Sequence, residues 1–216
     1  MNEPLATPHR APAVRRIPRG QQRRSQLVSV AEQVFLELGF STSTMQTIAS
    51  RAGASKETLY RHFASKEALF AEVVSRRAAQ ISGPESGFLS AGPPKAVLFS
   101  LGFNLVRRMT EGEAPALLRL AIAETSRSPE LGVILYEKGP GTTQDRLTAY
   151  LRDATARGEL RCEQPEQAAR LFLGAVIANY RVLSLINPPK TKATEAEIRG
   201  HVHNAVGMFL SYYGAS

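Results

Sequence analysis

Residues 41–70, STSTMQTIASRAGASKETLYRHFASKEALF, predict two short helices joined by a tight turn and followed at once by another helix. Ser43 or Thr44 can cap the first of the pair, because their side-chain oxygens accept hydrogen bonds from the free N–H groups of a helix start. Gly53 permits the sharp turn, since glycine reaches left-handed backbone conformations at low cost. Ser55 can then cap the second helix. This arrangement indicates a helix-turn-helix.

The apolar residues of this stretch fall on the faces that such a unit buries. Small Ala49 and Ala52 allow the two helix backbones to approach closely, and Ser65 starts the helix that follows. The predicted inward positions are Met45, Ile48, Ala49 and Ala52 in the first helix, Leu59 and Phe63 in the second, and Leu69, Phe70 and Val73 in the next.

A supporting helix is predicted upstream, from about Gln22 to Leu38, and Gly39 suits the position just beyond its end. Its apolar positions share one face, and they are Leu27, Ala31, Val34, Phe35 and Leu38. Residues 1–20 hold four prolines and four arginines with few large apolar groups, so we expect a disordered basic arm. This arm is either a solvated tail or a segment that follows phosphates or enters a minor groove.

The second helix of the pair carries the physical case for DNA binding. A helix fits the major groove with its N-terminal turn nearest the base edges. That turn offers Lys56, whose ammonium suits guanine O6 and N7, and Thr58, which can bond a base or touch a thymine methyl. Tyr60, His62 and Lys66 are spaced to flank it with donors for phosphate oxygens.

The net charge of +8 is concentrated in the first third of the chain. Residues 1–82 hold 12 Lys and Arg against 6 Asp and Glu, whereas the remaining residues hold 15 against 13. This positive field favours a polyanionic partner in that region. Anionic lipid, the competing partner, would call for a continuous amphipathic helix with a basic polar face, and the region shows none.

Composition is that of an ordinary globular protein, with 43% hydrophobic residues. No uninterrupted apolar run approaches the roughly 20 residues that span a bilayer, and the N-terminus lacks the apolar segment of a secretory signal. Cys162 is the single cysteine, which makes an intramolecular disulfide impossible and is read as an incidental thiol rather than a redox group. We therefore expect a cytoplasmic protein without a membrane partner.

A family resemblance is carried by the run GFSTSTM-x-x-IA-x-x-AGASKETLYRHFASKEALF. Residues 22–70 resemble the DNA-binding domain of the tetracycline-repressor (TetR) family, and GASK-x-TLY-x-HF-x-SKE-x-L is highly specific for it. The resemblance implies phosphate contacts for Thr44, Tyr60, His62 and Lys66, and places near base edges for Gln46, Lys56 and Thr58. Two residues depart from the family pattern: Ala54 stands where valine is commoner, and Glu57 puts a carboxylate beside the phosphates, in a role that stays open.

After Ser82 the segment GPESGFLSAGPP, residues 83–94, predicts a linker. It would join a DNA-binding domain with its connecting helix, residues 21–82, to a helical effector-binding and dimerisation domain, residues 95–216. No strand-like alternation is found, so the expected fold class is all-α. The downstream helices are predicted at Val97–Met109, Ala114–Glu124, Ser128–Arg157 (either continuous or broken at Gly139-Pro140), Pro165–Ile186 and Thr194–Tyr213.

Two of these helices suggest a second subunit. Residues 171–186 are apolar around most of the helix circumference, which indicates burial on more than one side. The last helix carries an apolar stripe made of Ile198, Val202, Ala205, Phe209 and Tyr212. The resemblance implies that these two helices pair with their counterparts in a homodimer, although an ordinary core explains the same pattern. A two-fold dimer could engage both halves of a palindrome.

The resemblance also implies a cavity for a small-molecule effector among the middle helices. The apolar residues of these helices suggest that the effector is hydrophobic or amphipathic. The candidate lining residues are Phe99, Phe103, Leu118, Ile122, Tyr136, Phe172 and Tyr180, with Arg107 or Asn179 as polar anchors.

The principal prediction is a ligand-responsive transcriptional regulator, a repressor that binds a palindromic operator on double-stranded DNA as a homodimer and is released by a small hydrophobic molecule. The first alternative is a constitutive DNA-binding protein without an effector, and the second is an all-α enzyme. No HExxH, GxSxG or GxxxxGK[ST] motif occurs. His201 and His203 would point about 200° apart on one helix and make a poor metal-binding pair, so we expect no metal, cofactor or catalytic residue.

Overall fold

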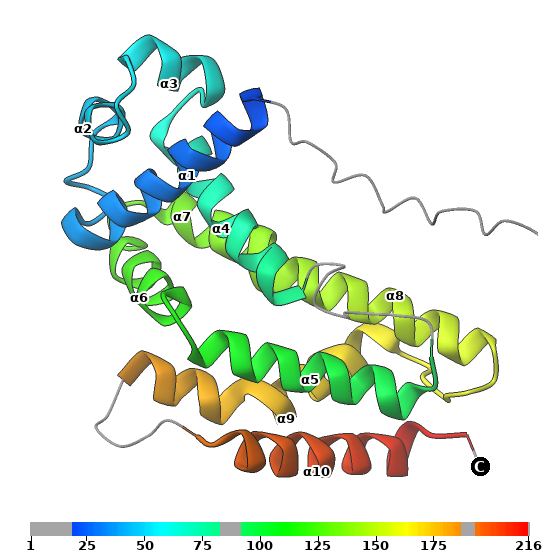
Figure 1. Ribbon diagram of the computed structural model, residues 1–216. Helices are drawn as coiled ribbons and strands as arrows, with labels where there is room; N and C mark the ends of the chain where they lie inside the picture. The colour runs from blue at the N-terminus through cyan, green and yellow to red at the C-terminus, as the bar shows by residue number, and fades with distance from the viewer. Residues whose placement is uncertain (1–18, 83–91, 187–192, 216) are drawn as a thin grey trace, which may run out of the picture.

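The computed structural model describes residues 19–82, 92–186 and 193–215, and it confirms the all-α fold class (Figure 1). Four helices form what we call the head: α1 (Arg19–Leu38), α2 (Met45–Arg51), α3 (Lys56–His62) and α4 (Lys66–Ser82). Within the described ranges the only strand-like pairing is an isolated bridge between Leu160 and Gly214. Residues 1–18 of the predicted basic arm and most of the predicted linker lie outside the described residues, whereas Arg19 and Gly20, predicted as the end of the arm, begin α1.

The remaining helices form what we call the body. They are α5 (Pro94–Thr110), α6 (Ala114–Glu124), α7 (Pro129–Tyr136), a π-helical turn η2 (Glu137–Gly141), α8 (Thr142–Ala156), α9 (Pro165–Ile186) and α10 (Glu195–Tyr213). Figure 1 shows α5, α9 and α10 side by side at one end of the molecule and the head at the other. Helix α6 stands between α1 and α5, and α4 runs alongside α7 towards the body.

The head has its own hydrophobic core, built around three phenylalanine rings. Phe70 lies 5.7 Å from Phe35 and 5.4 Å from Phe40 between ring centroids, both at edge-to-face angles that favour aromatic pairs. This core also takes in Leu117 and Ala121 of α6 and Leu131 of α7. Two body helices therefore complete the core of the head, and we call this cluster the shared core.

The body core joins α5, α8, α9 and α10. Gly102 allows α5 to come close to α9 and α10, because a Cβ atom at this position would lie 2.9 Å from Cγ1 of Val202 and 3.4 Å from Cγ1 of Val176. Valine side chains are stiff, so neither could move aside at low cost. Glycine at this position therefore fixes the packing distance of the body.

The predicted inward faces of the head are confirmed except at one position. All nine residues predicted to face inward in α2–α4 are buried, as are four of the five in α1. Leu38 is 40% exposed, because it sits in the last turn of α1, beyond the reach of α4. The stripe on α10 needs a larger correction. Ile198, Val202, Ala205 and Phe209 are buried in the chain's own body core, so they are not a pairing surface, and only Tyr212 is exposed.

The chain continues through Gly139-Pro140 without a break, as a π-helical turn. Pro140 has no N–H, and a proline ring clashes with the carbonyl four residues earlier, so a regular α-helical turn is disfavoured. Gly141 is needed as well, because a Cβ there would lie 2.9 Å from the carbonyl oxygen of Tyr136. The turn thus links α7 to α8 while it changes the helical register.

Helix α9 is long and apolar enough to cross a membrane by length and composition, with a mean hydropathy of 1.4 over its most apolar window. It is not an uninterrupted apolar run, because Arg170, Asn179 and Arg181 lie among its apolar residues. One such helix is weak evidence for a membrane span, because core helices of folded proteins pass the same test. Here α9 packs against α5, α8 and α10.

Candidate nucleic-acid interface and effector cavity

Helix α3 is held by its cap at one end and by its buried side chains along its length. The Ser55 hydroxyl oxygen accepts a hydrogen bond from the Thr58 N–H at 3.1 Å, as a cap should. Leu59 is fully buried, which turns the opposite face of α3 to solvent. On that face the Lys56 ammonium lies 5.8 Å from the ring centroid of the exposed Tyr60. The outer face thus presents a cation and an aromatic hydroxyl in one patch.

Thr44, rather than Ser43, caps α2. Its hydroxyl oxygen accepts from the Thr47 N–H at 3.0 Å, while the buried Ser43 hydroxyl donates to the Gly39 carbonyl at 2.5 Å. Gln46 follows in the first turn of α2 and is exposed. The predicted contacts Thr44, Gln46, Lys56 and Tyr60 are thus exposed at the surface of α2 and α3, with Thr58 and His62 partly buried beside them.

In the structure Lys66 has a structural role that was not predicted from the sequence. Its ammonium donates to the carbonyl oxygens of Phe40 at 2.7 Å and Ser43 at 2.9 Å, and it lies 4.3 Å from the Phe40 ring centroid. These bonds hold the turn between α1 and α2. Lys66 was predicted to bind phosphate, but its donors are largely used within the protein, because the carbonyls of Phe40, Ser41 and Ser43 all lie within reach of its ammonium.

Two arginines of α1 also serve the head and were not predicted. Arg23 donates to the carbonyls of Ala52 at 3.2 Å and Gly53 at 2.9 Å, which fastens the turn between α2 and α3. Arg24 pairs with Glu72 at 2.8 Å and lies 4.8 Å from the Phe63 ring centroid. Both contacts join residues far apart in the chain, so no local sequence signal could have identified them.

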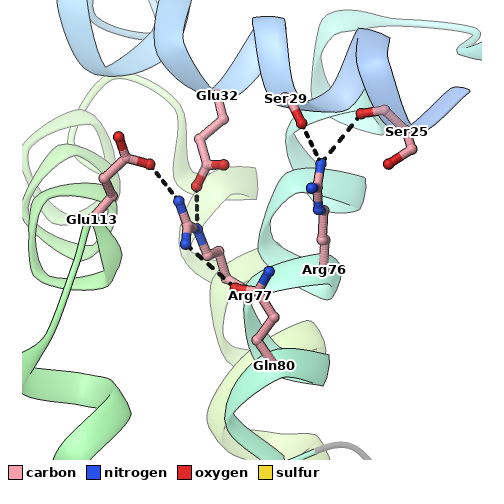
Figure 2. A network of polar contacts seen from close by, with 7 residues as sticks. All are labelled: Ser25, Ser29, Glu32, Arg76, Arg77, Gln80 and Glu113. Carbon is pink, nitrogen blue, oxygen red and sulfur yellow. Dashed lines mark hydrogen bonds and ion pairs between the residues drawn. The ribbon is translucent and has the colours of Figure 1, made fainter. Parts of the chain in front are cut away.

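A third arginine joins the head to the body (Figure 2). Arg77 of α4 forms ion pairs with Glu32 of α1 and Glu113 just before α6, and it donates to Gln80 at 3.3 Å. Glu32 is only 7% exposed. A carboxylate so little exposed is stable in its charged form only when it is paired, so this contact is costly to break.

Helix α6 contacts the head at one end and the body at the other. The Ser41 hydroxyl donates to Glu124 at the end of α6, and this bond lowers the pKa of the Glu124 carboxyl. In the other direction Arg119 donates to the carbonyl oxygen of Ser184 in α9 at 2.7 Å. A displacement of α9 or α6 would therefore also displace the loop that precedes α2.

A cavity of about 120 Å³ lies between head and body. Its wall is mostly apolar and comes from every helix between α4 and α9. Val74 and Leu117 line it and also belong to the shared core. One layer of side chains therefore separates the cavity from the core of the head.

The predicted effector residues match this cavity at one position only. Leu118 lines it, and the other eight predicted residues do not. They fall into three groups according to where the structure places them. Phe103, Phe172 and Tyr180 are buried in the body core, Phe99 lies at its edge, and Arg107, Ile122, Tyr136 and Asn179 are exposed. The buried aromatic residues among them pack in the body core, while the cavity wall is mostly aliphatic, and Leu118 is the one aliphatic wall residue that was predicted.

The described residues contain no group of three or more His, Cys, Asp or Glu that could hold a metal ion. The His201 ring bonds the Val176 carbonyl at 3.0 Å, whereas His203 is exposed, so the two rings do not converge. Burial raises the pKa of the Cys162 thiol, which disfavours the reactive thiolate.

Comparison with known families accounts for both halves of this architecture. Residues 27–73 match the family described as "Bacterial regulatory proteins, tetR family". Residues 96–215, more than half of the chain, match the family described as "AefR-like transcriptional repressor, C-terminal domain". The chain belongs to the TetR family of transcriptional regulators.

Curated relatives of this TetR-family protein are DNA-binding regulators. The transcriptional activator FasR of Mycolicibacterium smegmatis is 46% identical over 61 residues, which span 28% of this chain and 27% of FasR. The transcriptional regulator UidR of Escherichia coli is 28% identical over 144 residues, which span 65% of this chain and 70% of UidR. The first similarity is confined to a short segment of both proteins, and the second extends further.

Solved structures resemble nearly the whole chain. A TetR-family regulator from Mesorhizobium loti superposes with a TM-score of 0.75 at 28% identity, covering 92% of this chain and 100% of that one. The flavonoid-responsive regulator FrrA superposes with a TM-score of 0.76 at 28% identity, covering 90% and 98%. The protein is thus a DNA-binding transcriptional regulator in family and in fold.

Substitution of the two lysines of the head should show which of them stabilises the fold. Lys66→Met removes the donor for the carbonyls of Phe40 and Ser43, so we expect a loss of about 1–3 kcal/mol in the free energy of unfolding, measured by urea denaturation. The control is Lys56→Met, which removes an exposed ammonium from the same head and should leave the free energy of unfolding within ~0.5 kcal/mol of the parent. Equal stability of the Lys66 variant and the parent would contradict the anchoring role.

Proposed function

We propose that this TetR-family protein is a ligand-responsive repressor that binds a palindromic operator as a homodimer and is released when a small molecule enters the cavity between head and body. The observation that carries the proposal is the position of this cavity. Val74 and Leu117 belong both to its wall and to the shared core, so a ligand that moves them also moves the support of α3. The C-terminal family's description as a repressor domain supports the direction of the effect.

For the DNA interface, we propose that α3 enters the major groove. Lys56 and Thr58 lie in its first turn, where a recognition helix contacts base edges, and Gln46 lies in the first turn of α2. Thr44, Tyr60 and His62 contact phosphates around this turn. Lys66 contributes from behind, by holding the loop that carries Thr44, and shares its ammonium with a phosphate at most.

For the dimer, we propose that the outward faces of α9 and α10 pair with the same faces of a second copy. On α9 six exposed apolar and small residues follow one helical stripe: Leu171, Gly174, Ala175, Ala178, Val182 and Ile186. On α10 Met208 is 65% exposed and Tyr212 is 80% exposed, beside the exposed Gly207. Large apolar side chains gathered on two neighbouring helices are typical of an interface, and glycines allow close approach.

Release of the DNA would follow from a change in the distance between the two heads of the dimer. A dimer reads two half-sites about 34–36 Å apart, so a small rotation of each head spoils the fit. A ligand that spreads α4 from α6 would rotate the head about its contacts with the body. FrrA, a structural neighbour, is described as flavonoid-responsive, which supports control by a small molecule.

Two alternatives remain distinct from this proposal. A constitutive DNA-binding protein would have the same α3 surface, but no small molecule would change its operator affinity. An activator is favoured by one observation, the 46% identity with the activator FasR, although that match covers only 27% of FasR. The enzyme alternative has no support from the family or the relatives, which are transcriptional regulators.

Operator selection from random DNA tests the reading surface. We expect an inverted repeat, because a two-fold dimer presents two copies of α3. Lys56→Ala should change the preferred base at one position of each half-site, by about 1–3 kcal/mol of discrimination. Tyr60→Ala should instead weaken all sequences alike. Uniform loss from both variants, or a motif without two-fold symmetry, would contradict the assignment.

A charged substitution tests the proposed dimer surface. Met208→Glu places a carboxylate on the proposed interface, so we expect sedimentation as a monomer at micromolar concentration and a loss of operator affinity of about 10-fold or more. Val133→Glu is the matched control, because Val133 is an apolar residue of α7 with 56% exposure and lies outside α9 and α10. A Met208→Glu variant that sediments as a dimer would overturn this interface.

A further inference from the structure

The polar groups in the wall of the cavity are few, and three of the four already have partners. Among the lining residues these are Arg77, Thr143, Arg181 and Ser184. Arg77 is neutralised by Glu32 and Glu113. The Thr143 hydroxyl donates to the Gly139 carbonyl at 3.5 Å, and the Ser184 hydroxyl donates to the Arg181 carbonyl at 2.8 Å.

Arg181 differs from the other three. Among the residues that the structure describes, its guanidinium makes one weak contact, to the sulfur of Met109 at 3.7 Å, and pairs with no carboxylate. Burial alone lowers the pKa of this guanidinium, with no acidic neighbour to offset it. A guanidinium carries five N–H donors in a planar fork that matches a carboxylate. The wall therefore holds one cation whose binding capacity is almost unused.

The other lining residues limit what can reach this cation. Leu105, Leu118, Leu135, Leu173 and Ile177 surround the cavity with aliphatic carbon. Its volume of about 120 Å³ is close to that of an apolar protein cavity of ~150 Å³ that takes up benzene. A single ring or a short alkyl chain fits this space, whereas a highly charged or strongly hydrated molecule would lose its water without replacement.

We propose that the effector is a small amphipathic carboxylate, whose apolar part fills the cavity and whose carboxylate forms a two-pronged ion pair with Arg181. This proposal rests on the proposed function and specifies its ligand class. The pairing is favourable because both the half-buried cation and the carboxylate gain a partner in a place of low polarity. Arg77 does not compete, since two carboxylates already occupy it.

The position of Arg181 connects the ligand to the head. Arg181 lies three residues before Ser184, whose carbonyl accepts the hydrogen bond of Arg119 from α6. Helix α6 in turn contacts the head through Glu124 and Ser41. A carboxylate drawn to Arg181 thus binds beside the point where α9 holds α6.

The test uses the full-length dimer and two probe acids, 3-phenylpropanoate and octanoate, each compared with its primary amide. We expect each acid to bind the parent at least 10-fold more tightly than its amide by calorimetry, and to raise the melting temperature accordingly. Equal binding of acid and amide, or no binding of either acid, would overturn the proposal without any variant being made.

The Arg181→Gln variant provides a second test of the proposal. The acid-over-amide preference should fall to about 2-fold or less, while the unliganded variant unfolds at the same temperature as the parent or higher, because an unneutralised half-buried charge has been removed. Arg170→Gln, an exposed arginine of the same helix, should leave the preference unchanged. A preference retained in Arg181→Gln would overturn the proposal.

Operator affinity, measured in the same titrations, separates this proposal from the proposed function. Acids that bind through Arg181 but leave operator affinity unchanged support the carboxylate site and contradict release by ligand. Acids and amides that bind equally and both weaken operator binding support release and contradict the carboxylate site.

Discussion

The ion pairs of Arg77 are the contact on which the arrangement of head and body depends. Arg77 stands on α4, the only helix of the head that runs into the body, and it holds Glu32 of α1 with one side of its guanidinium and Glu113 before α6 with another. Because Glu32 is almost fully buried, removing its partner would leave an isolated charge in a place of low polarity. The pairing therefore ties α4 to α1 and to the start of α6, and Arg77 also lines the cavity.

This geometry makes the helix-turn-helix dependent on the body. The head does not close its own core, since Leu117, Ala121 and Leu131 from α6 and α7 complete it. Protein interiors are close-packed, so a ligand that shifts one layer of side chains moves the next layer rather than compressing it. Helix α6 is well placed to transmit such a shift, with Arg119 bonded to α9 and Glu124 bonded to Ser41. The same contacts would make the apo head rigid enough to read DNA.

The sequence predicted the head almost completely and the body only in outline. Caps and helical periodicity are local signals, so the Ser55 cap and the inward faces of α2–α4 were identified from neighbouring residues, and the α2 cap was narrowed to Ser43 or Thr44. The roles of Lys66, Arg23 and Arg77 arise from contacts between residues far apart in the chain, which no spacing reveals. In the body, periodicity showed that a face of α10 is apolar but not which partner covers it, and the stripe turned out to face its own core. Most lining residues of the predicted cavity were missed for a related reason, because leucines that line a space and leucines that fill one look alike in a sequence.

The central claim is that the body holds the head in its DNA-reading position through Arg77, and one substitution tests it directly. Glu113→Gln removes the body's side of the ion pair and leaves Glu32 paired. Operator affinity of the unliganded protein, measured by fluorescence anisotropy at one fixed salt concentration, should fall by about 5-fold or more, a typical coupling between two sites. The matched control is Glu111→Gln, whose carboxylate pairs with Arg107 of α5 and, among the residues that the structure describes, with no other cation, and which should leave affinity unchanged. A Glu113→Gln variant that binds the operator as tightly as the parent would contradict the account.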